Sequence, residues 1–338
     1  MKQTYSFDDV LLVPQYSSIE SRSEVSMDCN LGEFNFSLPV ISSPMDTVTE
    51  AGMVKAMSKV GGLGIIHRYN SMEEQARIVA HARMSGCENI GAAIGVTGEY
   101  LDRAMCLVEA GANILCVDVA HGHHAMMRSA LEQLKNTLGD KTHIMAGNVA
   151  TLEAFEALAG WGADSIRVGI GGGSICSTRI VTGHGVPTFQ SILECAQTSY
   201  DTKIIADGGI KTSGDIVKAL AAGADFVMIG SMLSGTEETP GEALVNAKGE
   251  KYKEYRGMAS KKAQREWRGK SSTPEGVSAM VPFKGPVNDI LQDISGGIRS
   301  GLSYTGVRSL QELQNKRRFI LQSSAAQLES NTHILWRR

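Results

Sequence analysis

Hydrophobic and polar positions follow a repeated order along the chain, in which a short apolar run comes after a longer amphipathic segment. At residues 110–115, 162–166 and 222–227 the same kind of phrase recurs, a glycine beside alanine, then Asn or Asp, then apolar residues. Glycine just past a helix supplies the left-handed residue of a C-cap, and a β-branched apolar run is typical of a strand buried on both faces. The pattern predicts repeated helix–strand units.

Eight apolar runs are candidate strands. They lie at residues 38–41, 63–67, 90–94, 114–119, 143–146, 165–168, 203–206 and 226–229. Strict alternation of strands with helices predicts a parallel sheet, and eight units favour a closed (β/α)8 TIM barrel over an open doubly wound sheet. We therefore expect residues 1–338 to form a single α/β domain, because barrels of this kind exceed the usual domain length.

The alternation stops near Gly235. A polar stretch rich in Lys and Arg follows, so we expect a mobile lid or flap loop over the barrel mouth at residues 235–280, and then a C-terminal tail. Its most basic part, residues 261–270, holds five cations and one anion. Such runs are usually solvated faces, but contact with a phosphate-bearing cofactor is the alternative here.

Composition narrows the classes of partner. The net charge is −3, too balanced for a general attraction to nucleic acid or to an anionic membrane. Asp8 and Asp9 stand where a secretory signal needs an apolar run, and no apolar stretch reaches the roughly 20 residues of a membrane span. The six cysteines show no paired short spacing, which indicates reduced thiols. We expect a cytoplasmic protein that binds neither nucleic acid nor membranes.

In a barrel, the residues that do chemistry follow the strands at the C-terminal face. Two glycine turns follow the last two predicted strands, at residues 207–209 and 230–231, where barrels commonly bind phosphate through backbone amides. Ordinary tight turns are the alternative. Asp207 would repel a phosphate and suits a pair of ribose hydroxyls, whereas Asp118 suits a polar ligand such as a carboxamide.

The most unusual segment is residues 169–179, in which four glycines precede a small polar run that contains Cys176. A flexible loop, backbone amides and Arg179 at a barrel mouth favour a thiolate nucleophile. The other five cysteines are expected to be inert small hydrophobes. His121, His123 and His124 have no carboxylate or cysteine at ligand spacing, which argues against a metal.

Six short sequence motifs together resemble those of a known family. They are Phe-Asp-Asp-Val-Leu-Leu-Val-Pro at 7–14, Ser-Pro-Met-Asp-Thr-Val-Thr at 43–49, Gly-Gly-Gly-Ser-Ile-Cys-Ser-Thr-Arg at 171–179, Asp-Gly-Gly-Ile at 207–210, Tyr-Arg-Gly-Met at 255–258 and Gly-Gly-Ile-Arg-Ser at 296–300. In this order, over nearly the whole chain, they resemble the IMP dehydrogenase/GMP reductase family. The resemblance implies a (β/α)8 barrel, a homotetramer and a purine nucleotide substrate.

The resemblance also implies roles for individual residues. Cys176 would be the nucleophile that attacks C2 of the purine, with Thr178 and Glu275 as a proton relay. The substrate site would comprise Ser43, Met45, Ser174, Asp207, Gly209, Gly230, Ser231, Tyr255, Gly257 and Met258. The nicotinamide cofactor would lie against Asp118, Asn148 and Gly169. The backbone carbonyls of Gly171, Gly173 and Cys176 would correspond to a monovalent-cation site that can take potassium.

Two activities share this covalent chemistry. The dehydrogenase oxidises IMP with NAD and then needs an Arg-Tyr pair on a long flap to activate water, whereas the reductase converts GMP to IMP with NADPH. The reductase is favoured because no CBS modules interrupt residues 85–88, because residues 258–275 are short and lack that pair, and because residues 21–25 resemble the reductase N-terminus. Other features are more similar to the dehydrogenase. They are the segments at 43–50, 66–67, 120–123, 274–276 and 301–305, and Ser272 also stands where reductases carry an arginine. IMP dehydrogenase is thus the alternative.

Two other classes are less favoured. A nucleotide sensor would not need Cys176, Thr178 and Glu275 together, and a flavin-dependent barrel oxidoreductase would place FMN at the same phosphate turns.

Overall fold

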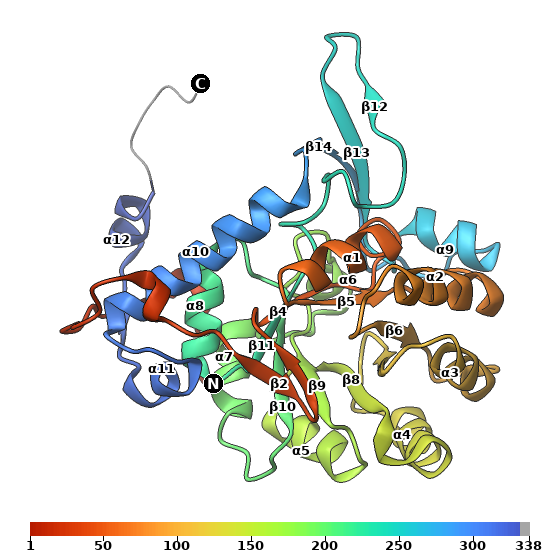
Figure 1. The fold of residues 1–338 in the computed structure, drawn as a ribbon, viewed down its shortest axis with the longest axis horizontal. Helices are drawn as coiled ribbons and strands as arrows, with labels where there is room; N and C mark the ends of the chain where they lie inside the picture. The colour runs from red at the N-terminus through yellow and green to blue at the C-terminus, as the bar shows by residue number, and fades with distance from the viewer. Residues whose placement is uncertain (332–338) are drawn as a thin grey trace.

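The computed structural model of the chain describes residues 1–331, apart from the side chain of Arg268. Eight parallel strands close into a barrel in the order β10-β11-β4-β5-β6-β7-β8-β9 (Figure 1). Their bounds are β4 Val40–Ser42, β5 Leu63–Ile66, β6 Gly91–Ile94, β7 Ile114–Asp118, β8 His143–Val149, β9 Ser165–Val168, β10 Lys203–Asp207 and β11 Phe226–Ile229. All eight predicted strands and the (β/α)8 fold are confirmed.

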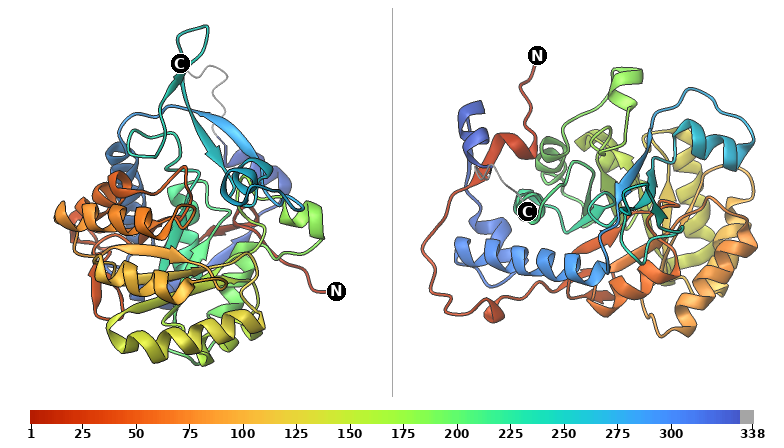
Figure 2. Two further views of the ribbon diagram at one scale, coloured as in Figure 1. Left: turned by 90° about the vertical axis from the view of Figure 1, so that its right-hand side faces the viewer. Right: turned by 90° about the horizontal axis from the view of Figure 1, so that it is seen from above.

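Helices surround the barrel between consecutive strands (Figures 1 and 2). They are α1 Ala51–Lys59, α2 Met72–Met84, α3 Tyr100–Glu109, α4 Ala125–Leu138, α5 Leu152–Gly160, α6 Thr178–Thr182, α7 Thr188–Cys195, α8 Ser213–Ala222 and α10 Val287–Thr305. Local sequence sets their starts, because Ser71 and Thr212 accept hydrogen bonds from the backbone amides of Glu74 and Asp215. Residues 85–90 connect α2 directly to β6.

Two apolar cores hold the barrel together. One fills the barrel interior and includes Ile41, Ile65, Met145 and Phe226, while a larger one lies between the strands and the helices. The hairpin of β2 Cys29–Leu31 and β3 Phe34–Phe36 adds Leu31 and Phe36 to the interior cluster. This hairpin therefore closes the N-terminal end of the barrel and leaves the C-terminal end for a site.

The expected lid at residues 235–280 is not one long loop. It contains a three-stranded antiparallel sheet of β12 Leu244–Val245, β13 Lys251–Arg256 and β14 Ser278–Pro282, and the helix α9 Lys261–Arg268. The sheet projects beyond the barrel at the top of Figure 1. In β13 the buried positions are Lys253 and Tyr255, and charged residues stand between and beside them, so the apolar–polar alternation of a half-buried strand is hidden and the sequence suggests a loop. We call residues 235–282 the flap.

The expected C-terminal tail is also ordered in most of its described part. It begins with α10, which packs against α8 and serves as the eighth barrel helix after the flap insertion. The elements α11 Leu310–Lys316, β15 Phe319–Leu321 and α12 Ser324–Glu329 follow, and β15 pairs antiparallel with β1 Val10–Leu12. Three short 3-10 helices, η1 Phe7–Asp9, η2 Arg22–Glu24 and η3 Gly139–Lys141, complete the elements.

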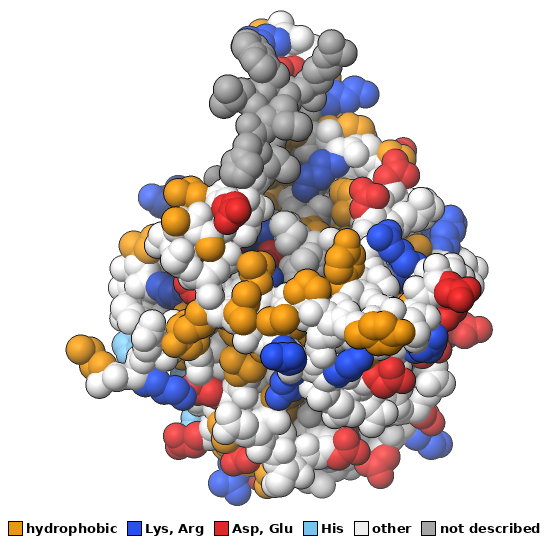
Figure 3. Space-filling model, turned by 90° about the vertical axis from the view of Figure 1, so that its left-hand side faces the viewer, with side chains coloured by type: hydrophobic (Ala, Val, Ile, Leu, Met, Phe, Trp, Pro, Cys, Tyr) orange, Lys and Arg blue, Asp and Glu red, His pale blue; other side chains and the backbone are white. Residues whose placement is uncertain are grey.

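The N-terminal segment and the C-terminal elements contribute exposed hydrophobic side chains to the surface. Tyr16, Tyr304, Leu321 and Leu328 are each more than half exposed. The face on the side of α10 and α12 shows hydrophobic side chains gathered in a band (Figure 3). An apolar patch of this kind is typical of a surface that contacts another protein. Among residues 1–331 there is no helix long and apolar enough to cross a membrane.

Candidate active site

A cavity of about 830 Å³ opens at the C-terminal ends of the barrel strands. All the residues proposed for the site line it. They are Ser43, Met45, Asp118, Asn148, Gly169, Gly171, Gly173, Ser174, Cys176, Thr178, Asp207, Gly209, Gly230, Ser231, Tyr255, Gly257, Met258 and Glu275. Residues separated by more than 200 positions along the chain therefore meet around one space.

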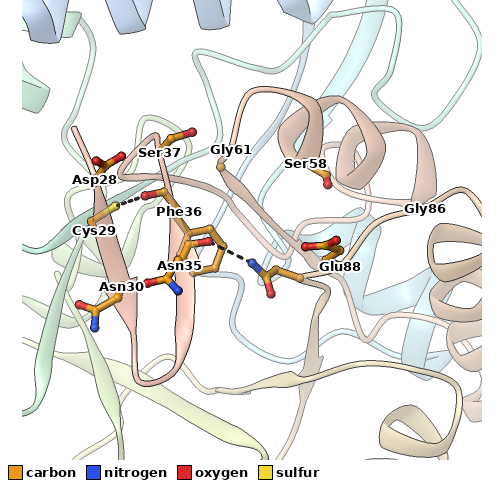
Figure 4. Close-up of a pocket in the computed structure, with 12 residues that line it drawn as sticks. Asp28, Cys29, Asn30, Asn35, Phe36, Ser37, Ser58, Gly61, Gly86 and Glu88 are labelled. Atoms are coloured by element: carbon orange, nitrogen blue, oxygen red, sulfur yellow. Dashed lines mark hydrogen bonds between the residues drawn. The ribbon is translucent and has the colours of Figure 1, made fainter. Parts of the chain in front are cut away.

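A second cavity, of about 760 Å³, lies beside the β2–β3 hairpin (Figure 4). Asp28, Cys29, Asn35 and Glu88 are among its lining residues, and none of the predicted site residues is. Burial, and then the charges of Asp225 and Asp28, raise the pKa of Cys29, so its thiol stays protonated. This end of a barrel serves stability rather than chemistry, and we place the candidate active site in the first cavity.

Cys176, Thr178 and Glu275 form a continuous hydrogen-bonded chain. The Cys176 thiol donates to Oγ1 of Thr178 at 3.2 Å, and that hydroxyl donates to Oε2 of Glu275 at 2.9 Å. Each donor points toward the next acceptor, so a proton that leaves the thiol has a path to the carboxylate. The arrangement is that of a nucleophile served by a general base through a hydroxyl.

The flap brings Glu275 to the cysteine loop. The amide of Ser177 donates to the carbonyl of Glu275 at 2.9 Å, and the amide of Val277 donates to the carbonyl of Ile175 at 3.0 Å. Gly276 lies between these bonds, where an added Cβ would come within 3.4 Å of the backbone of Ile175 and Gly257. A two-sided backbone contact therefore fixes the relay, although its members are 97 residues apart.

Arg179 supports the loop rather than the thiol, in contrast to the expectation from the sequence. Its guanidinium donates to the carbonyl of Val186 at 2.6 Å and to that of Ile170 at 3.5 Å. A Cβ at Gly171, whose φ is +80°, would lie 2.5 Å from Cγ of Arg179. The glycines at this point let the loop wrap closely around the arginine side chain.

One flank of the cavity gathers groups that suit a phosphate. Gly209 and Gly230 follow β10 and β11, and the Tyr255 side chain comes in from the flap. A Cβ at Gly230 would lie 2.7 Å from Oγ of Ser43 and 3.2 Å from the Tyr255 hydroxyl, so only glycine fits. Burial raises the pKa of Tyr255, a hydrogen bond with Ser174 acts in the opposite direction, and the net rise keeps the phenol a proton donor.

A buried ionic network joins the two flanks of the cavity. Arg167, on β9, donates to Oδ1 of Asp118 at 2.6 Å and to Oδ2 of Asp207 at 2.9 Å. Asn148 donates to the same Oδ2 at 2.8 Å, which leaves Oδ1 of Asp207 for a ligand. Burial alone would raise the pKa of Asp118, but Arg167 and then Arg68 more than offset it, so the carboxylate is ionised.

Arg167 is not among the residues that the sequence singles out. The signal available for it is a charged residue between Ile166 and Val168 in the buried strand β9, because a buried cation needs partners. Two buried hydroxyls also point to a ligand site. Ser43 Oγ and Thr188 Oγ1 are buried, belong to residues that line the cavity, and have no hydrogen-bond partner among the described residues. Unpaired buried hydroxyls are costly, which makes both of them candidates for contact with a ligand or water.

The described residues contain no group of three His, Cys, Asp or Glu side chains that could hold a metal ion. His121, His123 and His124 thus form no such group. A monovalent cation would depend on the carbonyls of Gly171, Gly173 and Cys176, and the carbonyl of Gly173 already accepts the Cys176 amide at 3.1 Å. A carbonyl oxygen has a second lone pair, so this bond is compatible with a cation.

Comparisons with known proteins agree with this geometry. A family model described as IMP dehydrogenase / GMP reductase domain matches residues 4–333. An inosine-5'-monophosphate dehydrogenase from Nitrosopumilus maritimus is 34% identical over 470 aligned residues that cover 98% of each chain. A GMP reductase from Leishmania major is 33% identical, with 97% of this chain and 96% of the relative covered. The alignment lengths exceed 338, so both relatives contain residues that this chain lacks.

A solved structure is similar over its whole length. It is a GMP reductase from Trypanosoma brucei, a cysteine-to-alanine variant in complex with guanosine 5'-monophosphate. The two chains are 31% identical, 99% of each is covered, and the TM-score is 0.94.

Proposed function

The chain belongs to the IMP dehydrogenase/GMP reductase family, and we propose that it is a GMP reductase. In this reaction GMP, NADPH and two protons give IMP, NADP+ and an ammonium ion. The chemistry rests on the hydrogen-bonded chain from Cys176 through Thr178 to Glu275. The similar GMP reductase from T. brucei was captured in complex with guanosine 5'-monophosphate, which supports GMP as the nucleotide that this chain binds.

The relay serves two proton transfers. The Cys176 thiol passes its proton through Thr178 to Glu275, and the sulfur forms a bond to C2 of the purine. The same relay then returns a proton to the departing amino group, which leaves as ammonia and gives a thioimidate on Cys176. When bound, NADPH supplies the hydride to C2. The C2–sulfur bond breaks, and the thiolate is restored as IMP leaves.

The residues of the cavity support this assignment of substrates. The phosphate would be held by Gly209, Gly230, Ser231, Ser174 and Tyr255. The ribose hydroxyls would bind Asp207, and the base would lie against Ser43, Met45, Gly257 and Met258. Asp118, Asn148 and Gly169, on the other flank, would bind the nicotinamide half of the cofactor. The volume of about 830 Å³ is within the usual range for sites of small molecules and cofactors.

The flap favours the reductase over the dehydrogenase. Residues 258–275 contain no tyrosine, so the Arg-Tyr pair of the dehydrogenase is missing. Hydrolysis of a covalent intermediate without an activated water would stall, whereas the reductase needs no water at this step. IMP dehydrogenase is the second candidate, because two dehydrogenases are 34% and 33% identical to this chain.

A paired absorbance assay at the nicotinamide band tests the proposal. One cuvette contains GMP with NADPH and the other IMP with NAD, both with potassium. Loss of absorbance with GMP, with ammonia and IMP as products, would support the reductase. A sustained rise with IMP would instead assign the dehydrogenase. Replacement of potassium by N-methylglucamine in the active cuvette tests the carbonyl site at Gly171, Gly173 and Cys176, and NADH in place of NADPH tests the cofactor preference.

The same family resemblance leads us to propose a cytoplasmic homotetramer. The band of exposed hydrophobic side chains beside α10 and α12 is a suitable surface for contacts between copies (Figure 3).

A further inference from the structure

Two aromatic rings from separate elements meet at the edge of the active-site cavity. Tyr69 lies in the loop after β5, and Trp267 lies in the last turn of α9 in the flap. Their ring centroids are 5.9 Å apart and their planes are inclined by 71°. The guanidinium of Arg68 lies 5.0 Å from the centroid of the Tyr69 ring, and all three residues line the cavity. The proposed function assigns no role to this pair.

The order of the strands places the pair across the mouth from the nucleophile. In the closed barrel, β5 is four strands away from β9 in either direction, and β9 leads into the loop that carries Cys176. The phosphate turns follow β10 and β11 on one flank. On the other flank, Asp118 is the last residue of β7, and Asn148 lies near the end of β8. Tyr69 and Trp267 therefore stand at the end of the cavity farthest around the barrel from Cys176.

The proposed function places the nicotinamide half of the cofactor at Asp118 and Asn148, on this second flank. With the nicotinamide near C2 of the purine beside Cys176, the rest of a bound dinucleotide would extend past Asn148 and Asp118 toward β6 and β5. Arg68 lies on this path, because it contacts Asp118 with its Nε 3.4 Å from Oδ2 and with an Nη2 bond of 3.1 Å to the carbonyl. The far end of the dinucleotide is its adenine ring, and the far end of the cavity is aromatic.

We propose that Tyr69 and Trp267 bind the adenine ring of the nicotinamide dinucleotide. The inference rests on the proposed function in requiring that such a dinucleotide binds with its nicotinamide half beside Asp118 and Asn148. Every nucleobase has a flat π face, and loss of one base–aromatic contact lowers affinity by about 5- to 150-fold. The Arg68 guanidinium beside Tyr69 adds a cation to the same surface.

The helix that carries Trp267 also holds the segment that leads to the relay. Gln264 accepts hydrogen bonds from the amide of Ser272 at 2.8 Å and from its hydroxyl at 3.1 Å, and it donates to the carbonyl of Ala259 at 3.0 Å. The chain then reaches Glu275 three residues later. An adenine ring in contact with Trp267 would therefore stabilise the position of α9, and through Gln264 and Ser272 that of the segment that carries Glu275.

The test uses Trp267→Leu in the full-length protein. We expect the KM for NADPH to rise about 5- to 150-fold, while the Kd of GMP measured by calorimetry changes less than twofold. Reduced nicotinamide mononucleotide, which supplies hydride but lacks adenine, should give the same kinetics with both proteins. The control Tyr200→Leu removes an exposed aromatic ring from the connection between α7 and β10, outside the cavity, and should leave all three quantities unchanged.

A binding measurement separates this inference from the proposed function. In a Trp161→Phe/Trp336→Phe background, Trp267 is the remaining tryptophan. Adenosine diphosphate ribose, which has no nicotinamide, should quench its fluorescence whichever reaction the enzyme catalyses. A dehydrogenase with a raised KM for NAD in Trp267→Leu would overturn the proposed function and retain the inference. An unchanged cofactor KM together with no quenching would overturn the inference alone.

Discussion

Six cysteines sit in different surroundings, and these surroundings decide which of them can react. Cys116 and Cys195 are fully buried, and burial raises the pKa of Cys116 to about 11 and that of Cys195 to about 12, so both remain thiols at neutral pH. Cys176 is half-buried at a cavity and donates to a hydroxyl that leads to a carboxylate. A proton acceptor within reach distinguishes Cys176 from the buried thiols.

Cys176→Ala should abolish turnover and leave nucleotide binding intact. The change removes the nucleophile but no group that we assign to the phosphate or the ribose. Calorimetry with GMP and the absorbance assay measure the two properties separately, and Cys106→Ala, on the outer helix α3, is the matched control. Full activity in Cys176→Ala would exclude covalent catalysis by this residue.

The sequence is least informative about residues whose role is to position other side chains of the site. Cys176, Thr178 and Glu275 stand in recognisable phrases, and the structure brings them within hydrogen-bond distance. Arg167 is a charged residue in the short buried strand β9, but its role depends on Asp118 and Asp207, which lie 49 and 40 positions away. Local patterns contain no information on such partners, whereas the closed barrel brings all three together.

At the scale of elements, the flap is attached to the barrel at its base. Lys253 on β13 is buried, and its Nζ donates to the carbonyls of Thr236 at 3.2 Å and Thr239 at 2.5 Å. Burial lowers the pKa of Lys253, and Glu238 and then Glu237 act against that change. These bonds anchor one end of the antiparallel sheet, while residues of α9 and of the segment 272–276 line the active-site cavity.

The basic residues of α9 lie on the helix whose Gln264 and Trp267 line the cavity, and the sequence suggests them as contacts for a phosphate of the cofactor. Lys262 pairs with Glu254 at 2.7 Å, and both Lys261 and Arg265 are exposed. Changing Lys261, Lys262 and Arg265 to Gln should raise the cofactor KM, by up to about fivefold for each charge that contacts a phosphate. The Kd of GMP should stay within twofold. Lys248→Gln, in the turn between β12 and β13, is the control, and an unchanged KM would assign the three residues to a solvated face.

The barrel and the flap differ in how well the sequence predicts them. Strands such as β7 and β11 are apolar at nearly every position and follow the glycine that ends the preceding helix, so the sequence predicts their places to within one residue. In β13, Lys253 and Tyr255 are buried, and the charged residues between and beside them suggested a loop. A short exposed sheet obtains its order from backbone pairing with another strand, here with β14, and this pairing leaves a weak pattern in the sequence.

For the molecule as a whole, stability depends on the closure of the N-terminal end of the barrel. His143 begins β8 at that end, is 5% exposed, and shares a 2.8 Å hydrogen bond between its Nε2 and Oγ of Ser165. An added Cβ on Gly32, in the turn of the β2–β3 hairpin, would lie 3.6 Å from its Nδ1. A charge on this imidazole would therefore be buried between the barrel and the hairpin that seals it.

Burial, reinforced by Lys135 and opposed by Asp164, lowers the pKa of His143 from 6.5 to about 4. Between these two values the unfolded chain binds a proton that the folded protein does not, so stability falls as the pH decreases from about 6.5 toward 4. We expect the free energy of unfolding to be about 2 kcal/mol lower at pH 5 than at pH 7 from this residue alone. Urea unfolding at both pH values measures the difference. In His143→Gln, which keeps a polar side chain without the titration, this part of the loss should disappear. The exposed His81→Gln should retain it, and an equal loss in all three proteins would assign the acid sensitivity to other groups.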